Sequence, residues 1–176
     1  MGARDQHGTG APWGDEFRAV GKSLRKIEGL SKATGEAVYA DDIMLPGMLH
    51  AKLLRSPHAH ARIVSIDTSK ALALEGVHAI ITGADLPICY GVIPWTKDEN
   101  ALAVDKVRFI GDEVAAVAAI DEDTANAAVR LIEVEYEVLH SYFDPNESLV
   151  RHEPAIHPGN KHGNISKHVE LEFGDV

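Results

Sequence analysis

The sequence predicts an α+β fold in which two helices pack on one mixed sheet, and three observations predict it. In residues 133–138, Val134, Tyr136 and Val138 alternate with glutamates, which is typical of a strand with one solvent-exposed face. Residues 114–120 are almost wholly apolar, which indicates a central strand covered on both faces. Two further stretches place apolar residues at helical spacing, so helices must cover that sheet.

The expected elements follow one another as strands, helix, strand, loop, strands, helix and strand. Strands are predicted at 37–40, 48–55, 61–66, 77–81, 106–110, 113–120 and 133–138, and one more is conceivable at 169–173. The first helix carries Ala71, Leu72 and Leu74, with capping residues at 67–69 before it and Gly76 after it. The second spans 122–132 after the N-cap candidate Asp121.

Composition divides the chain into three parts. Residues 1–19 are Gly-rich and predict a flexible N-terminal arm, whereas residues 20–140 hold the periodic segments of a folded domain. Residues 141–176 lose that periodicity and contain several prolines, so an extended linker is expected. Residues 85–100 form a long loop without periodicity, and such loops in compact domains are often functional.

Charge and composition exclude several classes of partner. The net charge is −10, from 27 acidic and 17 basic side chains, so no nucleic acid partner is expected. The longest apolar run is too short to cross a bilayer, and no basic start precedes an apolar run, which predicts neither a membrane partner nor a signal peptide. Cys89 is the single cysteine, and this usage fits the reducing cytoplasm.

The histidines are the first candidates for a metal site. His58 and His60 stand two apart on an extended segment and could share a metal, but no third ligand follows at a suitable spacing. A turn whose histidines bond to backbone or face a neighbouring domain is therefore favoured. The later histidines fit no ligand pattern and are expected in a solvated linker: His152, His157, His162 and His168. We assign no metal-binding residue.

Cys89 and the carboxylates are the candidates for catalysis. No neighbour would lower the pKa of the Cys89 thiol, and apolar residues precede it, so a buried, inert thiol is expected. Paired carboxylates could serve acid–base chemistry, and the candidates are Asp98, Glu99, Asp112 and Glu113. Acidic surface residues are abundant in this chain, and Gly111–Asp112 is more simply a turn between two strands. We assign no catalytic residue.

Four segments stand in a recognisable order along the chain. They are Arg55–Ile63 with Ile66–Ser69, the spaced set Lys32, Gly35, Ala37, Tyr39 and Asp42, the run Asp105–Asp112, and Tyr136–Leu139. Together, from about Val20 onward, they resemble the α/β hammerhead domain of large subunits in the xanthine oxidase and aldehyde oxidase family of molybdenum hydroxylases. Gly91–Pro94 and Asp98–Asn100 look most similar to the 4-hydroxybenzoyl-CoA reductase branch.

This resemblance implies a complete enzyme that carries molybdopterin cytosine dinucleotide, [2Fe–2S] clusters and FAD. Such an enzyme inserts oxygen into, or removes it from, an electron-poor carbon of an aromatic or heteroaromatic substrate. In this family the cofactor loops and the catalytic glutamate follow the hammerhead domain, so the chain would bind no cofactor and would be inactive alone. The implied partners are the molybdopterin-binding remainder of the large subunit, reached through residues 141–176, and iron–sulfur and FAD subunits or domains.

The resemblance also implies a role near the substrate. Ala101 and Leu102 would border the substrate entrance, where the small Ala101 leaves room for a larger substrate. Pro94 and Trp95 would shape the same funnel wall. Ordinary loop packing is an equally good account. If the funnel role holds, replacing Leu102 by Trp in the intact enzyme should raise KM.

Two other functions stay open. One is a free-standing ligand-binding α+β module without redox chemistry. The other is an independent enzyme that uses Cys89 or the pair His58 and His60, although a third catalytic group is not evident. Because the family normally continues beyond this point, a truncated large subunit or one split between two genes is expected.

Overall fold

The first of two compact units in the computed structural model ends at Leu45, and its described part contains little regular structure. The structure describes residues 19–21, 23–91 and 97–174, so nearly all of the predicted arm, 1–19, lies outside them. The first unit holds helix α1 (Gly29–Thr34) and the 3-10 helix η1 (Ala40–Asp42). The strand predicted at 37–40 is wrong, because its backbone groups bond locally: Ala37 N–H donates to Ser31 O at 3.0 Å.

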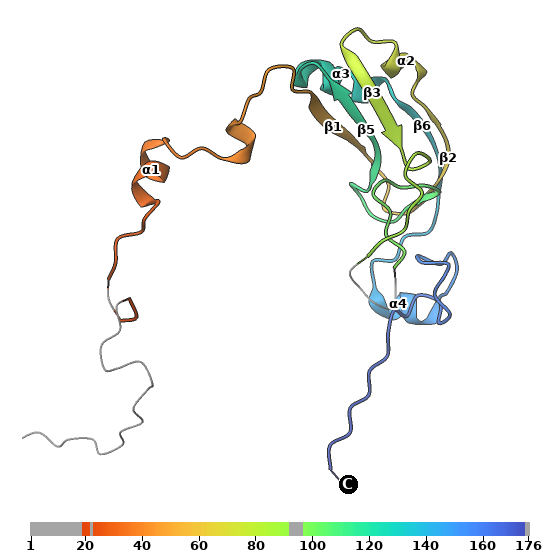
Figure 1. Ribbon diagram of the computed structural model, residues 1–176. Helices are drawn as coiled ribbons and strands as arrows, with labels where there is room; N and C mark the ends of the chain where they lie inside the picture. Colours follow the sequence, from red (N-terminus) through yellow and green to blue (C-terminus); the bar gives the residue numbers. More distant parts are fainter. Residues whose placement is uncertain (1–18, 22, 92–96, 175–176) are drawn as a thin grey trace, which may run out of the picture. The chain divides into compact units, whose positions relative to one another are not determined.

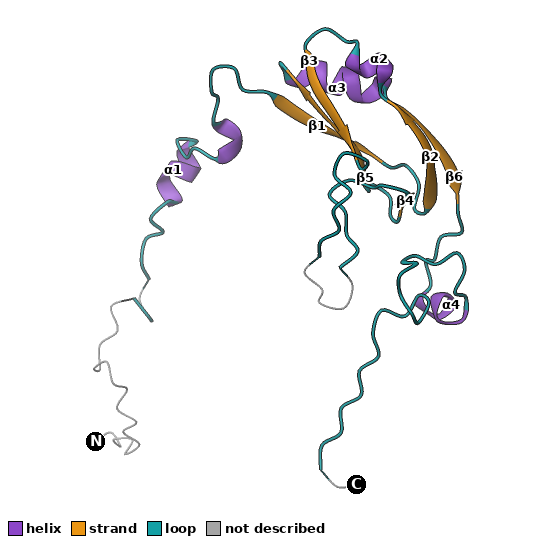
Figure 2. Cartoon of the chain, turned by 45° about the vertical axis from the view of Figure 1, so that its right-hand side comes forward, coloured by secondary structure: helices purple, strands orange, loops and turns teal. Residues whose placement is uncertain are grey.

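The second unit, from Pro46, contains two three-stranded sheets (Figures 1 and 2). Sheet A has the order β1 (His50–Arg55), β5 (Glu113–Ala119), β3 (Val77–Thr82), and sheet B has the order β4 (Lys106–Val107), β2 (Ala61–Asp67), β6 (Glu133–Val138). The α+β class is confirmed. The single mixed sheet is instead two sheets in which every described pair is antiparallel. Pro57 follows β1 and cannot donate to a ladder, so the chain leaves sheet A before β2 begins.

Strand β5 lies in the centre of sheet A, as its apolar sequence predicts. It pairs with β1 from Ala119 to Glu113 and with β3 from Ala119 to Ala115. None of its residues is exposed, and Val114 and Val117 are among the largest fully buried side chains. Its alternate residues point to opposite faces, so Val114 and Val117 enter two different core clusters.

Two helices cover one face of sheet A (Figure 1). Helix α2 (Ser69–Leu72) follows β2, and helix α3 (Glu122–Leu131) follows β5. The N-cap prediction for Asp121 is confirmed, because its carboxylate accepts the Thr124 N–H at 2.7 Å. Three of the five buried residues of this layer are alanines, which lets helix and sheet approach closely: Ala71, Ala115, Val117, Ala128 and Ile132.

A second core cluster lies toward sheet B. Its buried members are Ala61, Ala103, Val107 and Val114. Leu54, Ile66 and Val134 pack against both clusters, so the two cores are continuous. The two sheets therefore share one apolar interior although their hydrogen-bond ladders are separate.

Three local differences separate the structure from the sequence pattern. β4 ends at Val107 rather than at 110, because Asp112 N–H donates to Phe109 O at 3.2 Å and closes a turn. Gly111 supplies its φ of 94°. Helix α4 (Pro145–Val150) was not predicted. Residues 169–173 form no strand, since no described strand pairs with them.

Gly83 offers a test of the packing between β3 and the segment before β4. A Cβ atom there would lie 2.3 Å from the backbone oxygen of Ala103, so Gly83→Ala must displace backbone. We expect the free energy of unfolding to fall by about 2 kcal/mol, measured by urea denaturation. Gly159→Ala is the control, because nothing lies within 4 Å of its added Cβ. Equal stabilities of the two variants would contradict this packing.

Candidate functional site

Three segments meet beside the end of sheet B, and we call their meeting point the junction: residues 56–60, 106–113 and 155–157. Ser56 is buried and fixes the first segment to the second. Its N–H donates to Asp112 O at 2.9 Å, and Gly111 N–H donates to Ser56 O at 2.8 Å. The turn around Gly111 is therefore bonded directly to the end of β1.

His60 has only 3% of its surface exposed. Its Nδ1–H donates to the backbone oxygen of His140 at 2.7 Å, since a carbonyl can only accept. Burial lowers the pKa of His60, and the nearby Lys106 and Arg108 charges act in the same direction. The neutral ring leaves Nε2 as an acceptor with no partner among the described residues. The expectation that a histidine of this turn bonds to backbone is confirmed for His60.

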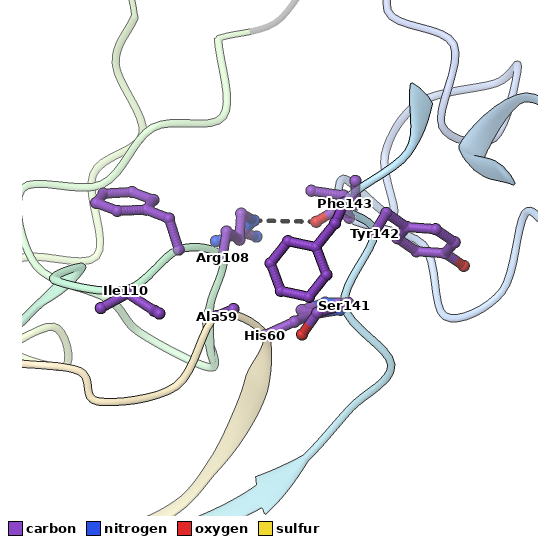
Figure 3. A pocket seen from close by; sticks show the side chains of 9 residues that line it. Ala59, His60, Arg108, Ile110, Ser141, Tyr142 and Phe143 are labelled. Carbon is purple, nitrogen blue, oxygen red and sulfur yellow. Dashed lines mark hydrogen bonds between the residues drawn. The ribbon is translucent and has the colours of Figure 1, made fainter. Parts of the chain in front are cut away.

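Two cations of the second segment hold the third. Lys106 is buried, and its Nζ donates to Ala155 O at 2.6 Å. Arg108 Nε donates to Ile156 O at 3.0 Å (Figure 3). Burial lowers the pKa of Lys106, and the neighbouring Arg108 charge adds to this. These side chains fix an extended piece of backbone beside β4.

Carboxylates complete the junction. A carboxylate oxygen of Asp98, in the loop before β4, is hydrogen-bonded to His157 Nδ1 and so links that loop to the third segment. Asp112 accepts the Arg108 N–H at 2.8 Å, while burial raises the pKa of its carboxyl group. The junction is thus a set of positioned charges that mostly bind the chain's own backbone.

Two cavities share Arg108, Phe109 and Ile156. The first, of about 280 Å³, is mainly apolar (Figure 3). It is lined by Ala59, His60, Arg108, Phe109, Ile110, Ser141, Tyr142, Phe143 and Ile156. The second, of about 430 Å³, carries four carboxylates, and it is lined by Tyr90, Asp98, Glu99, Asn100, Ala103, Arg108, Phe109, Asp112, Glu113, Ile156 and His157.

The donor sets of this chain do not fit the redox groups implied by the resemblance. A [2Fe–2S] cluster needs four ligands, usually cysteines, and the sequence holds only Cys89. The described residues contain no group of three or more His, Cys, Asp or Glu side chains placed to hold a metal. The acidic second cavity is a poor match for the pyrophosphate of a dinucleotide, which binds backbone N–H groups and cations.

The proposed funnel residues fall beside the second cavity rather than in its lining. Asn100 and Ala103 line that cavity, whereas Ala101 is exposed and Leu102 has 4% of its surface exposed. Pro94 and Trp95 lie outside the described residues. Ala101 and Leu102 are thus next in sequence to residues that line the second cavity, but neither of them lines it.

The expectation of a buried thiol is wrong, because Cys89 is exposed. The apolar neighbours Leu86 and Ile88 are exposed too, so this loop contributes nothing to either core cluster. Arg108 and Ile156 are junction residues that were not predicted from the sequence. The available signal was an isolated isoleucine between Pro154 and Pro158, which suits an extended segment docked on a surface.

Among the described residues, no helix has the length and apolar character needed to span a membrane.

Residues 34–140 match the family described as aldehyde oxidase and xanthine dehydrogenase, α/β hammerhead domain. The nicotinate dehydrogenase large molybdopterin subunit of Eubacterium barkeri is 41% identical over 165 residues, which cover 93% of this chain and 38% of that protein. The carbon monoxide dehydrogenase large chain of Afipia carboxidovorans is 40% identical over 151 residues, covering 84% of this chain and 19% of that protein.

Solved structures agree with these sequence matches. Quinoline 2-oxidoreductase from Pseudomonas putida 86 superposes with a TM-score of 0.69 at 37% identity, covering 77% of this chain and 18% of that one. Aldehyde oxidoreductase from Desulfovibrio gigas gives a TM-score of 0.68 at 32% identity, covering 76% and 16%. The chain therefore spans well under half the length of these similar proteins.

His60 predicts a pH dependence of stability. Because its pKa is lowered from 6.5 in the folded state, the unfolded chain binds more protons there below about pH 6.5. The free energy of unfolding should therefore fall as the pH drops below that value. His60→Asn keeps a donor for His140 O but cannot titrate, so urea denaturation should show a smaller loss between about pH 7 and about pH 5. The control is His162→Asn, because His162 is exposed. If the free energy of unfolding of His60→Asn depended on pH as steeply as that of the control, this role of His60 would be contradicted.

Proposed function

Because the chain belongs to the aldehyde oxidase and xanthine dehydrogenase hammerhead family of molybdenum-dependent large subunits, we propose that it is a scaffold and interface domain of such an oxidoreductase. The complete enzyme would hydroxylate, or reductively dehydroxylate, an aromatic or heteroaromatic substrate. This chain would position other parts of the enzyme rather than contact the reacting atoms. Its location in the cytoplasm stays a prediction from cysteine usage.

One observation carries the proposal. Nearly the whole chain, 93%, aligns with only 38% of a large molybdopterin subunit, so its counterpart there is one part of a longer polypeptide. In the proposed enzyme, molybdopterin cytosine dinucleotide is bound by the remainder of the large subunit. The [2Fe–2S] clusters and FAD belong to further subunits or domains.

The junction supports a positioning role. Lys106 and Arg108 bind the backbone of Ala155 and Ile156, so the chain after β6 is held beside β4 instead of leaving freely. A segment fixed in this way gives the polypeptide around it a defined direction. Residues 141–176 would then be a linker whose first half is docked, in place of a fully flexible one.

A small ligand-binding module is the second candidate, and the two cavities of about 280 and 430 Å³ favour it. In that case the isolated chain would bind an aromatic compound without a partner. In the scaffold role the cavities would be part of an interface, and residues of other parts of the complete enzyme would close them.

We expect the purified 176-residue chain to show no turnover and to contain neither molybdenum nor iron. The same chain within the complete large subunit should be recovered with molybdenum in stoichiometric amounts. Gel filtration combined with elemental analysis measures both. Turnover by the isolated chain, or a complete subunit that assembles without molybdenum, would refute the proposed function.

The funnel role is best tested at Ala101, because Leu102 is buried and a tryptophan there would disturb packing instead. Ala101→Trp in the complete enzyme should raise KM by roughly five- to tenfold with kcat little changed, since it narrows access without touching the reaction. Steady-state kinetics with the natural substrate measures this. Ala73→Trp, at an exposed position after helix α2, is the control. Identical kinetics of the two variants would remove Ala101 from the funnel.

A further inference from the structure

The middle of the outer face of sheet A, opposite helices α2 and α3, is apolar, and Arg55 lies at one end of that face. The strand register places Ala51, Ala118 and Ala79 in one row across β1, β5 and β3. The next row holds Leu53, Ala116 and Ile81. We call these six residues the outer face. Leu53 is 40% exposed and Ile81 is 39% exposed.

The helices cannot cover these residues, because they pack on the other side of the same sheet. Leu54, Ile80 and Val117 alternate with the outer face along their strands, and they belong to the core beneath the helices. Lys52 also points to the helix side, where it pairs with Glu122 of α3. The alternation therefore gives sheet A a second apolar face. The second core cluster covers this face at Val114, whereas Leu53 and Ile81 stay exposed.

In sheet B, a strand face that is exposed to solvent carries charged side chains. Along β6, Glu133, Glu135 and Glu137 alternate with half-buried apolar residues. These glutamates meet polar partners: Glu137 pairs with Arg62 at 2.9 Å, and Glu133 pairs with Lys70. Antiparallel sheets with one solvated face normally show this polar alternation. The six outer-face residues carry no charged or hydrogen-bonding side chain, and the charged pair Arg55–Glu113 lies beyond them at one end of β1 and β5.

The shape of the outer face favours a helix over another flat surface. Leu53 and Ile81 stand two strands apart on either side of Ala116, so at about 4.8 Å per strand their Cα atoms lie about 10 Å apart. We call this arrangement, two large residues flanking a row of alanines, the trough. An α-helix with its side chains is about 10–12 Å wide. Along the floor of this trough lie Ala116 and Ala118, whose small side chains allow a close approach. The inner face of the same sheet already receives α3 through alanines, including Ala128.

We propose that the outer face is the docking surface for an amphipathic α-helix from the remainder of the molybdopterin-binding large subunit. This inference rests on the proposed function and names the partner of the interface. The length of similar large subunits supports this occupant as well as the chemistry of the face. The chain covers 38% of one such subunit and 19% of another, so each contains much additional polypeptide that could supply the helix. A helix with an apolar stripe buries that stripe on an uncharged trough and keeps its polar side in water.

Thiol footprinting tests the proposal without destabilising the sheet. In a Cys89→Ser background, Leu53→Cys reports on the outer face and Val64→Cys is the matched control. Val64 is also an exposed apolar strand residue, 54% exposed, but it lies on sheet B. Each variant is treated with N-ethylmaleimide as the isolated chain and as the complete large subunit, and mass spectrometry follows the peptide that carries the new thiol. Elemental analysis of molybdenum is made on the same samples.

The expected result is that assembly slows labelling at Leu53→Cys by at least about tenfold and leaves Val64→Cys unchanged. A photoreactive maleimide attached at Leu53→Cys or Ile81→Cys should then cross-link to residues of one segment at helical spacing. Equal labelling in the isolated chain and the assembled subunit would overturn the inference, even if the subunit contains molybdenum. Protection of the isolated chain that grows with concentration would assign the face to a second copy and would also overturn it. If the assembled subunit lacks molybdenum, the proposed function fails, and the inference falls with it.

Discussion

The packing of β5 is the constraint on which the second unit depends. This strand is hydrogen-bonded on both edges, and its side chains enter both core clusters: Val117 lies beneath the helices and Val114 lies toward sheet B. Strand β2 is central in sheet B, but its one buried residue, Ala61, belongs to the second cluster alone. Leu54, Ile66 and Val134 then join the clusters into one interior, so the two ladders cannot separate without exposing apolar surface to water.

The small residues of β5 follow from this position. A central strand between a helical layer and an outer layer needs side chains that let both layers approach, and Ala115, Ala116, Ala118 and Ala119 provide them. Ala115 and Ala119 are fully buried, whereas Ala116 and Ala118 are only partly covered. The same alanine pattern thus appears on both faces of one strand, and a second layer on the outer face would complete it.

Local pattern predicted most of the second unit, because alternation and capping act over a few residues. The segments of β1, β2, β3, β5, β6 and α3 and the Asp121 cap follow from such signals. The division into two sheets did not, since it depends on which strands pair across long loops. Residues 169–173 show the limit most clearly: they alternate like a strand, yet the ladder partner that a strand requires is not found among the described strands. Conversely, Cys89 has apolar neighbours but lies in a loop that no core cluster includes.

The sequence gives only a weak signal for the junction, for a related reason. Its contacts join residues far apart in the sequence: Lys106 and Ala155 are 49 positions apart, and Asp98 and His157 are 59 positions apart. Removing cations from water is costly, and Lys106 and Arg108 recover that cost by donating to backbone oxygens and not to an external ligand. Groups already bonded to the chain's own backbone are poorly placed to act on a substrate, whereas they are well placed to hold a segment in register. The chemistry of the junction therefore agrees with a domain that positions other parts of the enzyme.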